Sequence, residues 1–193
     1  MLNDELGTRD IESVVRQAER DCRSSVSLSP RALAELLDTV ALQPALWEPR
    51  VRHEPAVRWY GSLYRDDVVD LWLLTWQQDN STDLHDHGGS GGAFRVLSGA
   101  LAEDRPVSGR GGTSLARSRR SVGQTVAFGP RLVHDVHNVE VQPAVSLHVY
   151  SPPLTSMTYY KLAGERLAPR FTEPVEVRSG AGRLPERAVT VDA

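Results

Sequence analysis

The chain has 193 residues, 40% of them hydrophobic, which is enough to bury one sizeable core and indicates one domain with extensions. Its formal net charge is −3, and its acidic and basic residues are well mixed, so it lacks the basic surface typical of nucleic-acid binding. It has no apolar run near the about 20 residues of a spanning helix, no signal-like segment and one cysteine, Cys22, so we expect a cytoplasmic protein that binds neither nucleic acid nor membrane.

The first part of the chain is predicted to be helical. Residues 10–22 carry one apolar stripe, formed by Ile11, Val14, Val15 and Ala18. A second helix is predicted to begin after Ser29, a good N-cap, with Pro30 in its first position and an apolar face of Leu33, Leu36 and Leu37. None of these positions has the spacing of a ligand set. We therefore predict that residues 1–55 form a helical extension packed on the rest of the protein.

From about residue 56 the sequence pattern changes to short runs of β-branched or aromatic residues separated by Gly, Pro, Asn and Asp. This pattern is typical of an antiparallel barrel or sandwich, and we predict a mainly β protein with a barrel over residues 56–177. Trp72 and Trp76 share one face of a predicted strand and are interpreted as core. The basic, Gly- and Ser-rich segment 110–120 is expected to be an exposed hairpin loop, and residues 178–193 a polar tail.

Two histidines one residue apart indicate a metal site. Side chains alternate faces along a strand, so His85 and His87 are predicted to point the same way and Asp86 the opposite way. Two imidazoles on one face can bind one ion. A third imidazole is available from His134 or His137, about one strand beyond a predicted turn.

Two groups of residues have the spacing of the two cupin motifs. They are His85, His87, Gly92 and Gly99, and then Gly123, His134 and Asn138. The sequence thus resembles the cupin superfamily, which implies a jelly-roll barrel and implies His134, not His137, as the third ligand. Many cupins have a glutamate at the position of Gly92, so the resemblance implies three neutral imidazoles and open positions for incoming ligands. We expect the glycines there to leave room for a chelating substrate.

A second alternating set, Ser146, His148 and Tyr150, follows in the segment AVSLHVYSPP. On a strand these three side chains share one face, while Leu147 and Val149 face the other way and pack. One interpretation is that these polar side chains form a solvated sheet face and have no further role. They can also form a hydrogen-bonded chain from hydroxyl to imidazole to phenol, which would hold the phenolic O–H in one direction.

Three segments, HDHGGSGG, HDVHN and PAVSLHVYSPP, together resemble the thiol dioxygenases, and most closely the bacterial cysteine dioxygenases. The resemblance implies Fe(II) bound by His85, His87 and His134. It implies a reaction in which a small thiol, L-cysteine, combines with O2 to give the sulfinate. Tyr150, aligned by His148 and Ser146, would then be the catalytic phenol.

Two further details follow from this resemblance. The bond between Ser151 and Pro152 is expected to be cis, as in relatives. In mammalian members a cysteine is cross-linked to the active-site tyrosine, and Gly92 stands at that position here. We therefore expect Tyr150 to be unmodified.

The substrate contacts are less well defined. Relatives that act on cysteine bind its carboxylate with an arginine on an early strand, and the corresponding position here falls near Tyr60 or Gly61. Arg58 or Arg65 could supply the guanidinium, and we favour Arg58 together with Tyr60 as the substrate contacts.

Several functions therefore stay open. The thiol could be 3-mercaptopropionate or a cysteine derivative instead of L-cysteine. The protein could also be a non-catalytic cupin that binds a ligand or metal, or a cupin enzyme that uses Zn or Mn, such as an isomerase. We expect a monomer or small homo-oligomer.

Overall fold

The structure is a computed structural model that describes residues 2–22, 27–54 and 58–175. Within these residues two helices, α1 (Leu2–Cys22) and α2 (Pro30–Ala41), precede two short 3-10 turns, η1 (Pro44–Leu46) and η2 (Glu48–Arg50). Helix α2 begins as predicted, because Ser29 Oγ accepts a hydrogen bond from the Ala32 backbone N–H at 3.2 Å. No helix of the described residues combines the length and apolar content needed to cross a membrane. The expected tail, residues 178–193, lies outside the described residues.

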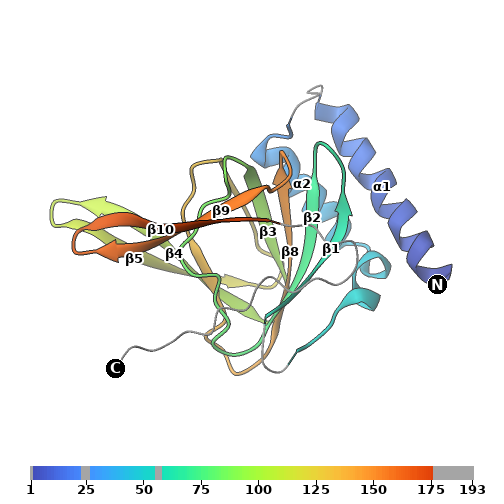
Figure 1. Cartoon of the computed structure of the whole chain (residues 1–193). Helices are drawn as coiled ribbons and strands as arrows, with labels where there is room; N and C mark the ends of the chain where they lie inside the picture. The colour runs from blue at the N-terminus through green and yellow to red at the C-terminus, as the bar shows by residue number, and fades with distance from the viewer. Residues whose placement is uncertain (1, 23–26, 55–57, 176–193) are drawn as a thin grey trace.

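Ten strands follow in the described part of the chain, and they pair into antiparallel sheets. They are β1 (Trp59–Arg65), β2 (Asp70–Trp76), β3 (Gly91–Ser98), β4 (Ala100–Gly109), β5 (Gly112–Ser121), β6 (Thr125–Phe128), β7 (Asp135–His137), β8 (Ala144–Ser151), β9 (Ser156–Ala163) and β10 (Arg166–Pro174). The sheet orders are β1-β2-β8-β3-β6, β5-β4-β7 and β10-β9. The sheets curl around a shared interior (Figure 1). The prediction of a mainly β, cupin-type barrel with an N-terminal helical layer is confirmed.

Strands β2 and β8 are buried on both faces, and their alternating side chains contribute to two separate cores. The outward-facing side chains pack with the two helices and include Leu71, Leu73, Leu147 and Val149. The inward-facing side chains fill the barrel and include Trp72, Leu74, Trp76 and Tyr150. Helix α2 covers the outer face through contacts with β3, β6 and β8 (Figure 1). The helices thus cover one face of the sheet, and the other face is left for the barrel interior. The domain limits at residues 55 and 177 stay predictions.

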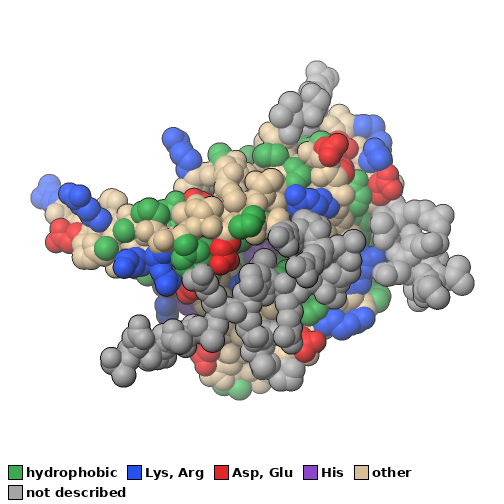
Figure 2. Space-filling model, in the orientation of Figure 1, with side chains coloured by type: hydrophobic (Ala, Val, Ile, Leu, Met, Phe, Trp, Pro, Cys, Tyr) green, Lys and Arg blue, Asp and Glu red, His purple; other side chains and the backbone are tan. Residues whose placement is uncertain are grey.

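Two long hairpins, β4–β5 and β9–β10, extend from the barrel on the side away from the helices (Figure 1). We refer to them together as the arm. The expectation of a loop over residues 110–120 is wrong, because this segment forms strand β5 from Gly112 and pairs with β4 throughout. The strand is largely exposed, so it lacks the apolar alternation by which sequence patterns reveal strands. Basic and acidic side chains both lie on the surface of the arm (Figure 2).

Candidate metal centre and active site

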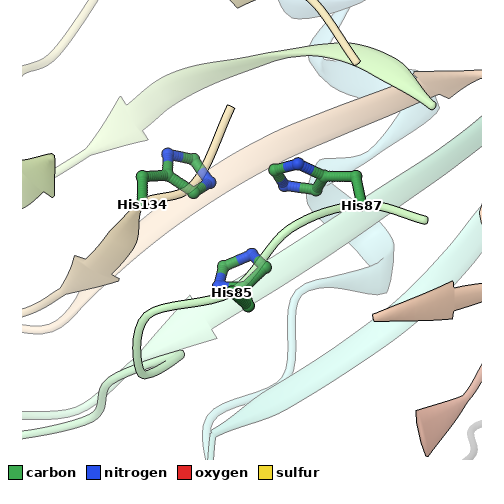
Figure 3. Close-up of side chains that lie close together, drawn as sticks. All are labelled: His85, His87 and His134. Carbon is green, nitrogen blue, oxygen red and sulfur yellow. The ribbon is translucent and has the colours of Figure 1, made fainter. Parts of the chain in front are cut away.

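Three buried histidines face one another inside the barrel (Figure 3). The ring centroids of His85, His87 and His134 form a nearly equilateral triangle, with separations of 4.9, 5.0 and 5.1 Å. One ring nitrogen from each lies within 4.8 Å of those of the other two. His85 and His87 lie between β2 and β3, not on a regular strand as we predicted, since only His85 makes isolated bridges, to His134 and Tyr159. Asp86 points away as expected, and it accepts a hydrogen bond from the Tyr160 hydroxyl at 2.7 Å.

Each of the three rings has at least one nitrogen that is free to bind an ion. His85 Nδ1 donates to the Asp83 carbonyl at 2.9 Å, and His134 Nδ1 donates to a Glu103 carboxylate oxygen at 2.8 Å. Both partners can only accept, so both rings have their lone pair on Nε2. The nitrogens of His87 are buried, and neither has a hydrogen-bond partner among the described residues. A buried polar atom without a partner is costly, and a metal ion would satisfy it. The donor set therefore fits a divalent transition metal.

Burial keeps the rings of His85 and His87 neutral. It lowers the pKa of His85 to about 3, with a further contribution from the neighbouring His134 ring. Burial, followed by the His85 and His134 rings, lowers the pKa of His87 well below its ordinary value. Neutral imidazole is the form that binds metal, so these two rings are ready to bind an ion at neutral pH.

Glu103, on β4, is a residue that the sequence analysis missed. Its side chain is fully buried and is shared by His134, Arg105 and Arg120. Burial raises its pKa, but the hydrogen bonds from His134, Arg105 and Arg120 outweigh this effect and lower the pKa to about 2. Glu103 accepts a hydrogen bond from His134 Nδ1, so the other ring nitrogen, Nε2, stays free to bind an ion. Among the residues that the structure describes, no carboxylate joins His85, His87 and His134 in the group of potential metal ligands.

Gly92 does not leave an open space, which corrects our expectation. A Cβ at Gly92 would lie 2.5 Å from the Phe128 ring and 2.9 Å from the Val149 carbonyl oxygen. Phe128 fills this position and stacks on the His87 ring with centroids 4.6 Å apart. The glycine therefore makes room for a side chain that packs against a histidine of the triad, not for a substrate.

The predicted chain of hydroxyl, imidazole and phenol has its three members within hydrogen-bond distance. Ser146 Oγ lies 2.9 Å from His148 Nε2, and His148 Nδ1 lies 3.4 Å from the Tyr150 hydroxyl. Burial lowers the pKa of His148 well below its ordinary value, and burial together with Asp70 raises the pKa of Tyr150. Trp76, interpreted from sequence only as core, also takes part, because its Nε1–H donates to Ser146 Oγ at 2.9 Å.

One cavity brings these groups together. His85, His134, His148 and Tyr150 line it, as do the expected substrate contacts Arg58 and Tyr60. Its apolar wall is formed by Trp72, Leu74, Val136, Leu154, Met157 and Val175.

Arg58 stands at the cavity without a full set of partners. Its Nη1 donates to the Ser81 carbonyl at 3.0 Å, and its guanidinium lies 5.1 Å from the centre of the Trp76 ring. Its Nε is buried and has no hydrogen-bond partner among the described residues, and burial lowers its pKa. Arg65, the alternative, does not line the cavity and instead pairs with the Asp70 carboxylate.

His137 lies apart from the three histidines, in a group with Asp104 and Asp135. Its Nδ1 is 3.4 Å from an Asp135 oxygen. Arg117 donates to both oxygens of Asp104 at 2.8 Å. His134, and not His137, is thus the histidine brought to His85 and His87. The bond between Ser151 and Pro152 is cis, as expected.

The fold and the site together define a cupin whose barrel holds three histidines and a hydrogen-bonded series of hydroxyl, imidazole and phenol groups. Residues 64–162, just over half of the chain, match the family model described as "Cysteine dioxygenase type I". The chain belongs to this family.

Curated relatives match part of the chain. It is 31% identical to "Cysteine dioxygenase type 1" of Danio rerio, in a match that covers 50% of this chain and 59% of the relative. It is 33% identical to the protein of the same name from Rattus norvegicus, with 44% of this chain and 45% of the relative covered. The chain thus spans about half the length of these relatives. A solved protein with a double-stranded β-helix domain from Klebsiella pneumoniae is 15% identical, with a TM-score of 0.46, and the match covers 63% of this chain and 91% of that one.

Proposed function

We propose that the protein is an Fe(II)-dependent thiol dioxygenase that converts L-cysteine or a related small carboxylated thiol, with O2, to the sulfinate. One observation carries this proposal: two histidines of the triad, the Tyr150 phenol and the Arg58 guanidinium line the same cavity. A place for a metal ion, a directed O–H donor and a cation for a carboxylate are thus next to one another.

His85, His87 and His134 would hold the metal ion. Three neutral imidazoles leave the charge of a divalent ion uncompensated, which favours binding of an anionic substrate such as a thiolate. Bound iron would lower the pKa of the thiol and supply the open positions at which the thiolate and O2 react. Imidazole ligands also suit Zn and other metals, so the assignment of iron rests on the family.

The proposed reaction balances without a further reductant. R–SH and O2 give R–SO2H, so two sulfur–oxygen bonds form and the bond within O2 breaks. Sulfur loses four electrons and O2 gains four. The thiol proton ends on the sulfinate or in solvent.

Arg58 would bind the substrate carboxylate. A half-buried guanidinium whose buried Nε has no hydrogen-bond partner among the described residues favours an anionic partner, and its planar fork matches a carboxylate. The Ser81 carbonyl and the face of Trp76 hold the group at the cavity wall. The ring of Tyr60, 5.8 Å from that of Trp72, would close the wall beside it.

The hydrogen bonds favour one direction for the chain that ends at Tyr150. The Trp76 indole can only donate, so Ser146 Oγ accepts from it. If Ser146 then donates to His148 Nε2, neutral His148 donates from Nδ1 to Tyr150, and the Tyr150 O–H is left for the cavity. The opposite direction would leave the Ser146 hydrogen without an acceptor among the described residues. Tyr150 would therefore act as a hydrogen-bond donor to the reacting substrate.

A second substrate has specific support. No Asp or Glu is among the described residues that line the cavity, so a substrate ammonium group would have no side-chain anion there. Cysteine would have to place its amine on the metal. 3-Mercaptopropionate has a thiol and a carboxylate but no amine, and it is the second candidate.

Oxygen uptake by purified, iron-loaded protein tests the proposal. Cysteine, homocysteine, cysteamine and 3-mercaptopropionate would be compared, with product masses measured by mass spectrometry. We expect uptake with a carboxylated thiol and formation of its sulfinate. Absence of uptake with all four thiols would reject the dioxygenase and favour a ligand-binding cupin. Turnover only with Zn or Mn would favour a cupin enzyme that uses one of these metals, such as an isomerase. A reducing compartment and a small assembly stay predictions.

A further inference from the structure

We infer that Glu103 is a positioning residue for the metal centre, which fixes the ring of His134 through its Nδ1 and thereby sets the affinity of the site. This inference rests on the metal site of the proposed function and not on its substrate. Glu103 would touch neither metal nor substrate.

The first support is the geometry of the bond. Glu103 Oε1 lies 2.8 Å from His134 Nδ1, and both side chains are almost fully buried. A carboxylate can only accept, so the proton must be on Nδ1 and the lone pair on Nε2. The bond therefore selects the tautomer that can bind the ion. It also prevents rotation of the ring.

The second support is that Glu103 is itself held rigidly. Arg105 Nε donates to Oε1 at 2.8 Å, and Arg120 donates to Oε2 at 2.9 Å from Nε and 2.6 Å from Nη2. These three donors leave the carboxylate little freedom to turn away from His134. A buried carboxylate without such partners would be costly, so the two arginines allow a charged acceptor behind the ligand.

The third support is that the other two rings lack an equivalent. His85 donates to a backbone carbonyl, and His87 has no hydrogen bond among the described residues. His134 is thus the ring with a charged acceptor. Such an acceptor increases the basicity of the imidazole, and it would make His134 the strongest donor of the three.

The arrangement also links the metal centre to the arm. Arg105 lies on β4 and Arg120 on β5, two strands of the arm, and Glu103 is paired with Val136 of β7, two residues after His134. The register of β4 with β7 therefore brings the carboxylate to the ligand.

Metal binding without substrate tests the inference. Cobalt(II) is titrated into metal-free protein and followed by its visible absorption, and zinc affinity is measured by competition with a chelator. We expect Glu103→Gln to weaken binding about 10- to 100-fold and to shift the cobalt bands. Glu140→Gln is the control, because Glu140 is an exposed carboxylate that pairs with Arg119 of β5 and lies outside the triad. It should bind both metals as the unchanged protein does.

A second variant separates positioning from folding. Glu103→Asp keeps the charge for the two arginines but withdraws the carboxylate by one methylene from His134. We expect the same direction of change in metal affinity and spectrum. In a His134→Ala background, Glu103→Gln should have no further effect on affinity, because its route to the metal is gone.

Two results would overturn the inference. One is unchanged cobalt spectra and affinities in both Glu103 variants. The other is an equal loss of affinity on changing Glu103 with and without His134. Neither result depends on turnover, so a protein that binds cobalt as expected but consumes no O2 would refute the proposed reaction alone.

Discussion

Trp76 and Ser146 are joined across strands β2 and β8, where the indole N–H donates to the serine hydroxyl at 2.9 Å. The same indole lies under the Arg58 guanidinium, with 5.1 Å between the guanidinium carbon and the ring centre. The fully buried Trp76 side chain thus contacts both the hydrogen-bonded series that ends at Tyr150 and the Arg58 guanidinium at the cavity wall.

Replacement of Trp76 by phenylalanine should therefore lower turnover more than metal content. The ring remains, but Ser146 loses the donor that sets its direction, and we expect kcat to fall roughly 10-fold, the value of about one buried hydrogen bond. Steady-state oxygen uptake and iron analysis would measure the two effects. Trp47→Phe is the matched control, because the Trp47 indole nitrogen has no hydrogen-bond partner among the described residues and its ring packs against the helical core. An unchanged kcat in the Trp76 variant would contradict this direction.

Replacement of Arg58 by methionine should impair only substrates with a carboxylate. Loss of a charge-assisted pair is expected to raise the KM for cysteine or 3-mercaptopropionate by about 10- to 100-fold. Cysteamine, which has no carboxylate, provides the comparison within the same protein. Arg110→Met, at the exposed tip of the arm, is the control variant. Equal effects on thiols with and without a carboxylate would remove Arg58 from this role.

A side chain at position 92 should disturb the metal centre through Phe128. The Cβ of Gly92→Ala would meet the Phe128 ring at 2.5 Å, so the ring must move off His87. We expect a loss of about 1–3 kcal/mol in the free energy of unfolding, the usual range for overpacking. Phe128→Leu in the same chain should recover part of it. Gly129→Ala, with no atom within 4 Å of the added Cβ, is the control. Denaturant unfolding gives both values.

Asp70 should make the stability of the metal-free protein fall with rising pH in mildly acidic solution. Burial raises its pKa from 3.8 to about 6, although Trp72 and Arg65 partly oppose this. Between these two values the folded protein keeps a proton that the unfolded chain has released, so stability decreases as pH rises. Asp70→Asn should remove this decrease.

The opposite sign is expected at Asp104. Hydrogen bonds from Arg117 outweigh burial and lower its pKa, so its contribution is present above 3.8 and lost at lower pH. Unfolding midpoints of Asp70→Asn and Asp104→Asn, followed from about pH 3 to pH 7, would compare the two. A slope unchanged by Asp70→Asn would refute the assignment.

The parts of the fold that follow from local patterns could be predicted from sequence. The alternation of Ser146, His148 and Tyr150 with Leu147 and Val149 places one set in the barrel and the other under the helices, as the structure has it. Ser29 and Pro30 likewise mark the start of helix α2. These signals depend only on neighbours along the chain.

The partners that come from distant strands could not be predicted. Glu103 and Phe128 reach the histidines through strand registers that the sequence does not reveal, and Trp76 meets Ser146 across 70 positions. One signal was available for Glu103. Side chains two positions apart share one face of a strand, so a carboxylate that follows the apolar Leu101 at this spacing is expected to be buried and to need a partner.

Reaction of the iron-loaded protein with its best thiol under 18O2 tests the central claim most directly. If both atoms of O2 are transferred to sulfur, each sulfinate molecule carries two 18O atoms, which mass spectrometry detects as an increase in mass over the product formed under ordinary O2. A sulfinate without the label, or a disulfide as the sole product, would contradict the account.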